Sequence, residues 1–78
     1  MFKVGDRVRF WKNISSLQLS YGEKNLPGKT GTVIDIAGYF IGVQFDYPIE
    51  KGHDCNGLGE NGKCRYVFEQ KLEPITKQ

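Results

Sequence analysis

Residues 29–46, KTGTVIDIAGYFIGVQFD, decide the fold class of this chain. They hold two runs rich in β-branched and aromatic residues, 29–36 and 39–46, which a two-residue Ala-Gly turn separates. Two such runs joined by a short turn that contains glycine are typical of a β-hairpin. Apolar side chains alternate along the second run, at Ile41, Val43 and Phe45. We therefore expect one face of this hairpin to be buried.

The segments on either side of this hairpin predict further strands. We expect them at residues 2–11, 64–67 and 71–75, with a single 3₁₀ turn at residues 68–70. In the first strand, Val8 and Phe10 share one face, and a turn or bulge at Gly5-Asp6 precedes the regular part. Pro74 confines the last strand to the edge of a sheet, because proline has no N–H to donate.

Two long connections complete the pattern. Residues 12–28 are too polar for a helix, and their alternating Leu17, Leu19 and Tyr21 predict a loosely paired hairpin folded over the sheet. Residues 46–63 form a second, Gly-rich connection. The sequence therefore predicts an all-β fold: a small five-stranded SH3-like barrel with a long first loop, a Gly-rich loop before strand four and a 3₁₀ turn before strand five.

Length and charge narrow the function classes. The chain has 78 residues, so we expect one domain over residues 1–78. Eleven Lys and Arg against nine Asp and Glu give a net charge of +2, which permits a nucleic-acid partner without favouring one. No apolar run approaches the roughly 18 residues that a membrane span needs, and no signal sequence is visible. We expect a cytoplasmic protein without a membrane partner.

Two segments carry a broad resemblance. VGDRV at residues 4–8 and GKTGTV at residues 28–33 resemble the V-G-D-x-V … G-x-x-G-x-V signature of SH3-like barrels of the KOW, CAP-Gly and Mib/Herc2 kinds. Gly-Asp turns the chain into the first strand, and the glycine pair lets the second strand bend as a barrel closes. This resemblance implies the fold and says little about function.

Residues 52–67, GHDCNGLGENGKCRYV, carry a sharper resemblance. With the Leu-Glu-x-Ile ending of the chain, they look like a group of small SH3-like proteins encoded by bacteriophages and prophages. The residues that carry the match are Gly52, His53, Asp54, Asn56, Gly57, Gly62, Cys64, Tyr66 and Val67. The resemblance implies an accessory protein in the cytoplasm of a bacterial host, and it implies no chemistry.

The same stretch contains every histidine and cysteine of the chain. His53, Cys55 and Cys64 could supply three zinc ligands, but the spacing H-x-C-x8-C lacks a C-x2-C pair. A Cys55–Cys64 disulfide and two reduced thiols are the alternatives. We expect no cofactor. We expect a structural loop instead, in which His53 and Asp54 bond to backbone groups among the surrounding residues Gly52, Asn56, Gly57 and Gly62.

Exposed aromatic and apolar side chains indicate a binding function. The candidate protein-binding residues are Leu17, Leu19, Tyr21, Phe40, Tyr47 and Tyr66. An alternative is RNA or DNA binding through Arg7, Arg9, Trp11 and Lys29, which combine positive charge with a stacking ring. No pair of groups suits acid–base or nucleophilic catalysis, so we expect neither an enzyme nor a small-molecule substrate. The sequence favours a phage-type accessory module that docks on a host or phage protein and modulates a host process such as defence.

Overall fold

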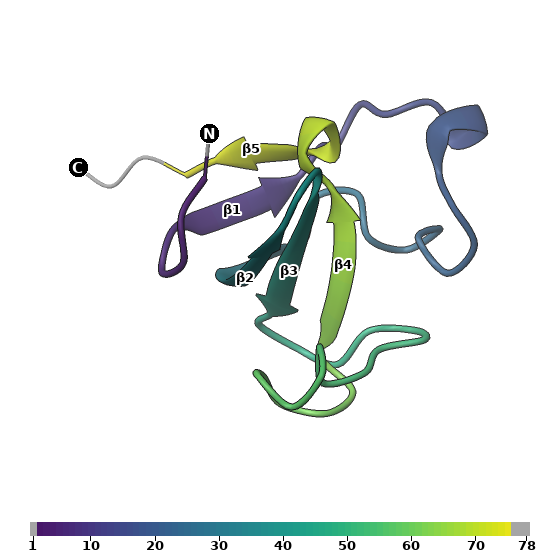
Figure 1. The fold of residues 1–78 in the computed structure, drawn as a ribbon. Coiled ribbons are helices and arrows are strands. Elements are labelled where there is room, and N and C mark those ends of the chain that lie inside the picture. The colour runs from purple at the N-terminus through teal and green to yellow at the C-terminus, as the bar shows by residue number, and fades with distance from the viewer. Residues whose placement is uncertain (1, 76–78) are drawn as a thin grey trace.

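The computed structural model describes residues 2–75 and shows an all-β chain, as the sequence predicts (Figure 1). Its elements are β1 (Arg7–Phe10), η1 (Ser16–Gln18), β2 (Thr30–Ala37), β3 (Phe40–Phe45), β4 (Cys64–Phe68), η2 (Glu69–Lys71) and β5 (Leu72–Pro74), where η marks a 3₁₀ helix. The strands form one antiparallel sheet in the order β4-β3-β2-β1-β5. β5 therefore ends the sheet, which is the edge position that Pro74 predicts.

The predicted hairpin is present as β2 and β3. Val33 lies opposite Val43, but the register shifts before Asp35, which lies opposite Gly42. The shift is a β-bulge with Ile34 as its extra residue, and it exchanges the faces of the residues that follow. Val33 and Asp35 would share a face in a regular strand. With the bulge, Val33 is buried and Asp35 lies on the outer face of the sheet.

The buried face of the sheet forms the core, and its main members are Val8, Phe10, Leu26, Val33, Ile41, Val43, Phe45, Val67 and Leu72. The alternation predicted for β1 and β3 is confirmed, because each of their predicted core residues is buried. Leu26 is the one member that comes from a long loop, and it is only 1% exposed. It fixes the end of residues 12–28 against the sheet.

Two expectations about the N-terminal third need correction. The first strand begins at Arg7 instead of residue 2, because Gly5 has a φ of 99° and the Asp6 N–H donates to the Lys3 carbonyl oxygen in a turn. Residues 12–28 contain η1 and no strand. Ser15 and Gln18 cap η1 reciprocally, side chain to backbone. These local bonds replace the cross-loop pairing of a hairpin, and Leu17 is left 94% exposed.

β1 and β5 cross β3 and β4 at a steep angle (Figure 1). η2 joins β4 to β5 at the corner between them, and the loop that holds η1 extends from the same side of the molecule. No helix within residues 2–75 is both long and apolar enough to cross a membrane.

Candidate functional site

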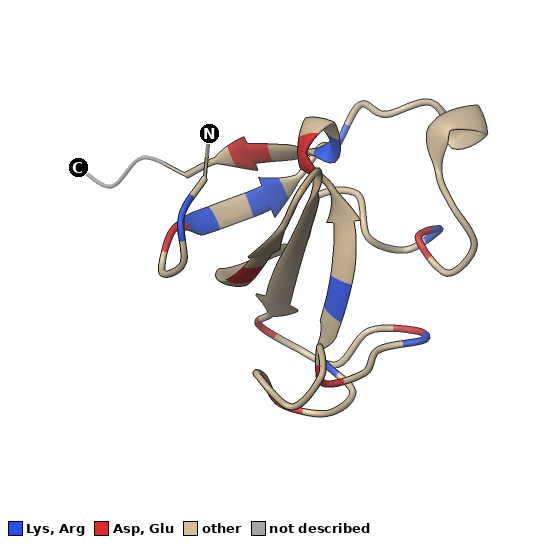
Figure 2. Cartoon of the chain, in the orientation of Figure 1, with Lys and Arg blue, Asp and Glu red and all other residues tan. Residues whose placement is uncertain are grey.

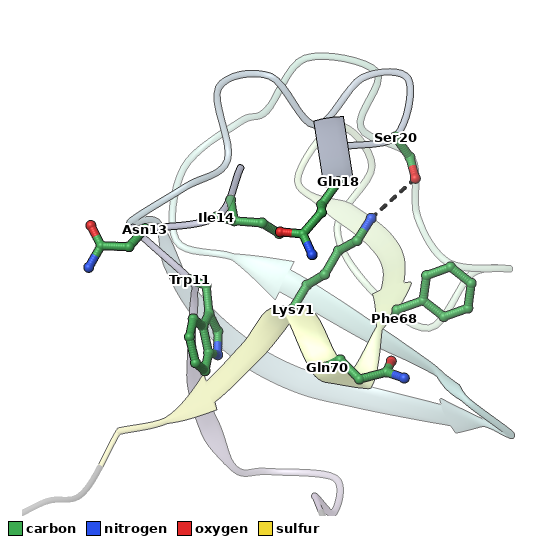
Figure 3. Close-up of a pocket in the computed structure, with 8 residues that line it drawn as sticks. All are labelled: Trp11, Asn13, Ile14, Gln18, Ser20, Phe68, Gln70 and Lys71. Carbon is green, nitrogen blue, oxygen red and sulfur yellow. Dashed lines mark hydrogen bonds between the residues drawn. The ribbon is translucent and has the colours of Figure 1, made fainter. Parts of the chain in front are cut away.

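A cavity of about 640 Å3 opens between the first long loop and η2 (Figure 3). Its lining residues are Trp11, Asn13, Ile14, Gln18, Ser20, Phe68, Gln70 and Lys71, and we call it the Trp11 groove. Trp11 and Phe68 lie on opposite sides of the Lys71 side chain. Their side chains are 46% and 41% exposed, so both rings present apolar surface to solvent.

Backbone pairing fixes Trp11 beside η2. The Trp11 N–H donates to the Lys71 carbonyl oxygen at 2.9 Å, directly after β1 pairs with β5. Ile14, which belongs to the first long loop and also lines the groove, packs against the core. The groove is therefore built on the β1–β5 corner of the sheet.

A buried ion pair holds the first long loop against η2. Lys71 Nζ lies 2.7 Å from Glu23 Oε1 and 3.2 Å from Ser20 Oγ, a contact drawn in Figure 3. Glu23 Oε1 also accepts the Ser20 N–H at 2.7 Å. The Glu23 side chain is 3% exposed. A charge pair this well covered restrains both partners, because separating them would leave a charge without compensation.

Arg65 makes a second attachment between β4 and the loop. Its Nη2 donates to the Tyr21 carbonyl oxygen, and its Nε lies 3.9 Å from Glu23 Oε2. The sequence did not point to Arg65, Glu23 or Lys71 as a group. They come from three distant segments, and no spacing pattern in the sequence connects them.

A second cavity, of about 420 Å3, lies on the outer face of the sheet. Its lining residues are Asp35, Ala37, Phe40, Asn56 and Tyr66, and we call it the Asp35 pocket. The Tyr66 O–H donates to Asp35 Oδ2 at 2.5 Å. This hydrogen bond, followed by burial, raises the pKa of Tyr66. A Cβ at Gly42 would lie 3.0 Å from Tyr66 Cε1, so the glycine makes room for the ring.

The two cavities share one aromatic pair. Phe68 lines the Trp11 groove, and Phe40 lines the Asp35 pocket. Their rings stack with centroids 4.6 Å apart and planes at 25°. The pair follows from strand register, since Phe40 lies opposite Phe68 at the junction of β3 and β4. The apolar surface is thus continuous from one cavity to the other.

His53 holds the Gly-rich loop through backbone groups. Its N–H and carbonyl oxygen pair with the carbonyl oxygen and N–H of Cys64, at 2.8 and 3.0 Å. Its ring Nδ1 accepts the Cys55 N–H at 2.9 Å. The Asp54 carbonyl oxygen accepts the Gly59 N–H at 2.9 Å. His53 also stacks on Tyr66, with ring centroids 6.1 Å apart. The loop therefore packs against Tyr66, one of the residues that line the Asp35 pocket.

Both cysteines are buried, free thiols. The Cys64 thiol donates to the Glu60 carbonyl oxygen at 3.2 Å. Burial raises the pKa of Cys55 to about 12 and also raises the pKa of Cys64. Thiols with a raised pKa stay neutral at physiological pH and are poor nucleophiles and metal ligands. Within residues 2–75, no group of three or more His, Cys, Asp or Glu side chains is arranged to hold a metal ion.

The six residues predicted to bind protein do not form one surface. Phe40 and Tyr66 meet in the Asp35 pocket. Leu19 and Tyr21 line another hollow, where Lys51 Nζ lies 5.0 Å from the Tyr21 ring centroid. Leu17 and Tyr47 are each exposed and lie outside both of the named cavities.

The four residues of the nucleic-acid alternative are also divided. Arg7 forms a two-pronged ion pair with Asp46, at 2.7 and 2.8 Å, which holds the pKa of Asp46 at about 2. Arg9 pairs with Glu73 across β1 and β5 at 3.4 Å, and Figure 2 shows basic positions on β1 beside an acidic one on β5. Lys29 is exposed, and Trp11 belongs to the groove. Both arginines of this face are therefore already matched by carboxylates.

Comparisons with protein-family models, curated proteins and solved structures give no significant match to this chain.

Proposed function

We propose that this protein is a non-enzymatic binding module that docks on another protein through the Trp11 groove. One observation carries the proposal: two half-exposed rings, Trp11 and Phe68, flank a cavity of about 640 Å3. Tryptophan and other large aromatic residues contribute much of the energy of protein interfaces. Asn13, Gln18 and Gln70 add amide groups at the rim, which can fix the orientation of a bound segment.

The attachment of the first long loop to η2 and to the core supports the same proposal. Glu23 and Lys71 join its two sides through a covered ion pair, and Leu26 fixes the base of the loop in the core. A site that is ordered before binding loses less conformational entropy when a partner arrives. The groove therefore favours docking without a large rearrangement.

The proposed fold is an SH3-like barrel, which the strand order favours. β2, β3 and β4 are consecutive neighbours, and β1 lies between β2 and β5. In such a barrel, the groove falls between the long first loop and the 3₁₀ helix before the last strand. As the resemblance of residues 52–67 implies, the proposed partner is a host or phage protein in the bacterial cytoplasm. Docking would then modulate a host process such as defence.

Two observations favour protein over nucleic acid and over catalysis. Arg7 and Arg9 already pair with Asp46 and Glu73, so they offer little net charge to a phosphate backbone. The thiols are buried with raised pKa values, and His53 Nδ1 already accepts a backbone N–H. The two cysteines and His53 therefore suit a structural role in the Gly-rich loop better than a catalytic one.

Affinity capture from host lysate, with and without nuclease treatment, tests the docking site. The comparison is between the wild type, Trp11→Ala and the control Leu58→Ala, which truncates an exposed apolar side chain outside the groove. We expect the wild type and the control to retain the same protein, identified by mass spectrometry, and Trp11→Ala to bind it about tenfold or more weakly. Equal retention by Trp11→Ala, or retention that nuclease abolishes, would contradict the proposal.

A further inference from the structure

The Asp35 pocket combines the carboxylate of Asp35 with the aromatic rings of Phe40 and Tyr66. Asp35 lies there because of the β-bulge at Ile34, which turns it away from the core. Tyr66 donates to one carboxylate oxygen, Oδ2. Among residues 2–75, no side chain donates a hydrogen bond to Oδ1 and no Lys or Arg pairs with Asp35. Oδ1 of this carboxylate therefore has acceptor capacity left for a ligand.

The walls of the pocket favour a positive ligand as well. Phe40 and Tyr66 present ring systems, and Asn56 adds an amide. The face of an aromatic ring carries negative electrostatic potential and attracts cations. A carboxylate beside such rings attracts a cation and repels an anion. A divalent metal ion would need several more oxygen ligands than one carboxylate and one amide provide.

We propose that the Asp35 pocket binds an arginine side chain of the protein partner. A guanidinium is planar, so it can lie against the Phe40 ring while its N–H groups donate to Asp35 Oδ1 and to the Asn56 amide oxygen. An ammonium offers no flat face for stacking. The pocket volume of about 420 Å3 accommodates a group of this size.

This inference rests on the proposed function, because it gives the chemistry of a partner that occupies the Trp11 groove. The stacked Phe40 and Phe68 rings join the two cavities into one surface. A segment with an apolar residue in the groove can therefore continue over this ring pair and place an arginine at Asp35. The arginine would then fix the direction in which the segment binds.

A peptide titration followed by 1H–15N NMR tests the pocket without the partner. The probes are Ac-Gly-Arg-Gly-NH2, its citrulline analogue, which keeps the shape without the charge, and its glutamate analogue. We expect saturable shifts at Asp35, Ala37 and Tyr66 with the arginine peptide alone. Asp35→Asn should weaken its binding about tenfold or more, because it removes a charged hydrogen-bond acceptor.

Two further variants sharpen the test. Ala37→Lys places a competing cation at the rim of the pocket, and it should weaken arginine binding even if Asp35→Asn disturbs the fold. Glu60→Gln is the control, since Glu60 is exposed and pairs with Lys63 instead of lining the pocket. We expect Glu60→Gln to bind like the wild type. Equal binding of the citrulline peptide, or unchanged binding by both pocket variants, would overturn the inference.

Trp11→Ala separates this inference from the proposed function. We expect it to lose the captured partner and to keep the arginine peptide. If the wild type ignores the arginine peptide while Trp11→Ala still loses the partner, the arginine pocket fails and the docking groove stands. If the peptide binds as expected while Trp11→Ala retains the partner, the groove fails and the pocket stands.

Discussion

Glu23 and Lys71 show how a single pair of residues organises a long loop. Their side chains are 3% and 11% exposed, although Glu23 belongs to a surface connection. Removing one partner of such a pair costs about 3–5 kcal/mol, because the remaining charge stays buried. The pair also spans 48 positions along the chain, so it links two segments that lie far apart in the sequence.

The first prediction concerns this pair. Glu23→Gln should lower the free energy of unfolding by about 2–4 kcal/mol, since Lys71 loses its counter-charge while the side-chain size is kept. Urea denaturation at pH 7 measures the change. The control is Glu50→Gln, an exposed carboxylate in the second loop, for which we expect a change within about 0.5 kcal/mol.

A double variant identifies the cause of the loss. Glu23→Gln with Lys71→Met removes both charges, so part of the lost stability should return. If the stability lost in the double variant equals or exceeds the sum of the losses in the two single variants, the ion pair is not the reason for the effect.

At the scale of elements, the Gly-rich loop depends on close backbone packing. A Cβ at Gly52 would overlap the carbonyl group of Gly62, and neither atom belongs to a flexible side chain. At this point the loop folds back on itself, next to the Ile49 N–H that donates to the Gly62 carbonyl oxygen at 2.9 Å. Glycine is therefore required for space at this position.

The second prediction follows from this contact. Gly52→Ala should lower the free energy of unfolding by about 2 kcal/mol or more, because backbone atoms must move to admit the methyl group. Gly38→Ala is the comparison: it has a φ of 63° but open space around its Cα, so we expect about 1–2 kcal/mol. Thermal unfolding of the two variants measures both effects. A smaller loss for Gly52→Ala than for Gly38→Ala would contradict the packing argument.

The elements differ in how far the sequence predicts them. Alternating apolar residues and a two-residue turn were enough for β2, β3 and their buried face. The sequence does not predict the bulge at Ile34. The regular pairing and the bulged pairing of β2 with β3 both place apolar residues beside polar ones, so the sequence pattern does not distinguish them. As a result, the sequence does not indicate Asp35 as a pocket residue, although it does indicate Phe40 and Tyr66 as binding candidates. The capped turn η1 was missed because Leu17, Leu19 and Tyr21 imitate the alternation of a strand.

The same limit applies to the Trp11 groove. Its walls come from the end of β1, the first long loop and η2, and sequence patterns do not report which distant segments meet. The residue type of Trp11 predicts a stacking role, which the sequence associates with nucleic acid. Arg7 and Arg9 form ion pairs with Asp46 and Glu73, and these pairs depend on how the strands align. The pairs make nucleic-acid binding by this face less favourable.

At the scale of the whole molecule, the reactivity of the two buried thiols measures how often the fold opens to solvent. Cys55 and Cys64 are both inaccessible to solvent, and burial raises the pKa of Cys55 to about 12. Only the thiolate reacts readily with a disulfide reagent, so a folded molecule at pH 8 protects both thiols by shielding and by keeping them protonated.

The third prediction uses this protection. In native buffer at pH 8, the reaction with 5,5′-dithiobis(2-nitrobenzoate) should be at least about a hundredfold slower than in concentrated urea, where both cysteines should react quickly. Absorbance at 412 nm follows the reaction. The native rate should rise in Gly52→Ala, which loosens the loop around Cys55. A thiol that reacts in the native protein as fast as in urea would show that the loop is open in solution.

The strand order has a consequence for how this protein can meet others. β4 and β5 end the sheet, and end strands expose backbone groups to which a second chain can add. β5 has only three residues and includes Pro74, which lacks a donor, while His53 occupies the backbone of β4 at Cys64. β5 therefore offers little to an added strand, and His53 closes the edge of β4 at its Cys64 end. Recognition by side chains, as proposed for the Trp11 groove, does not require an open strand edge.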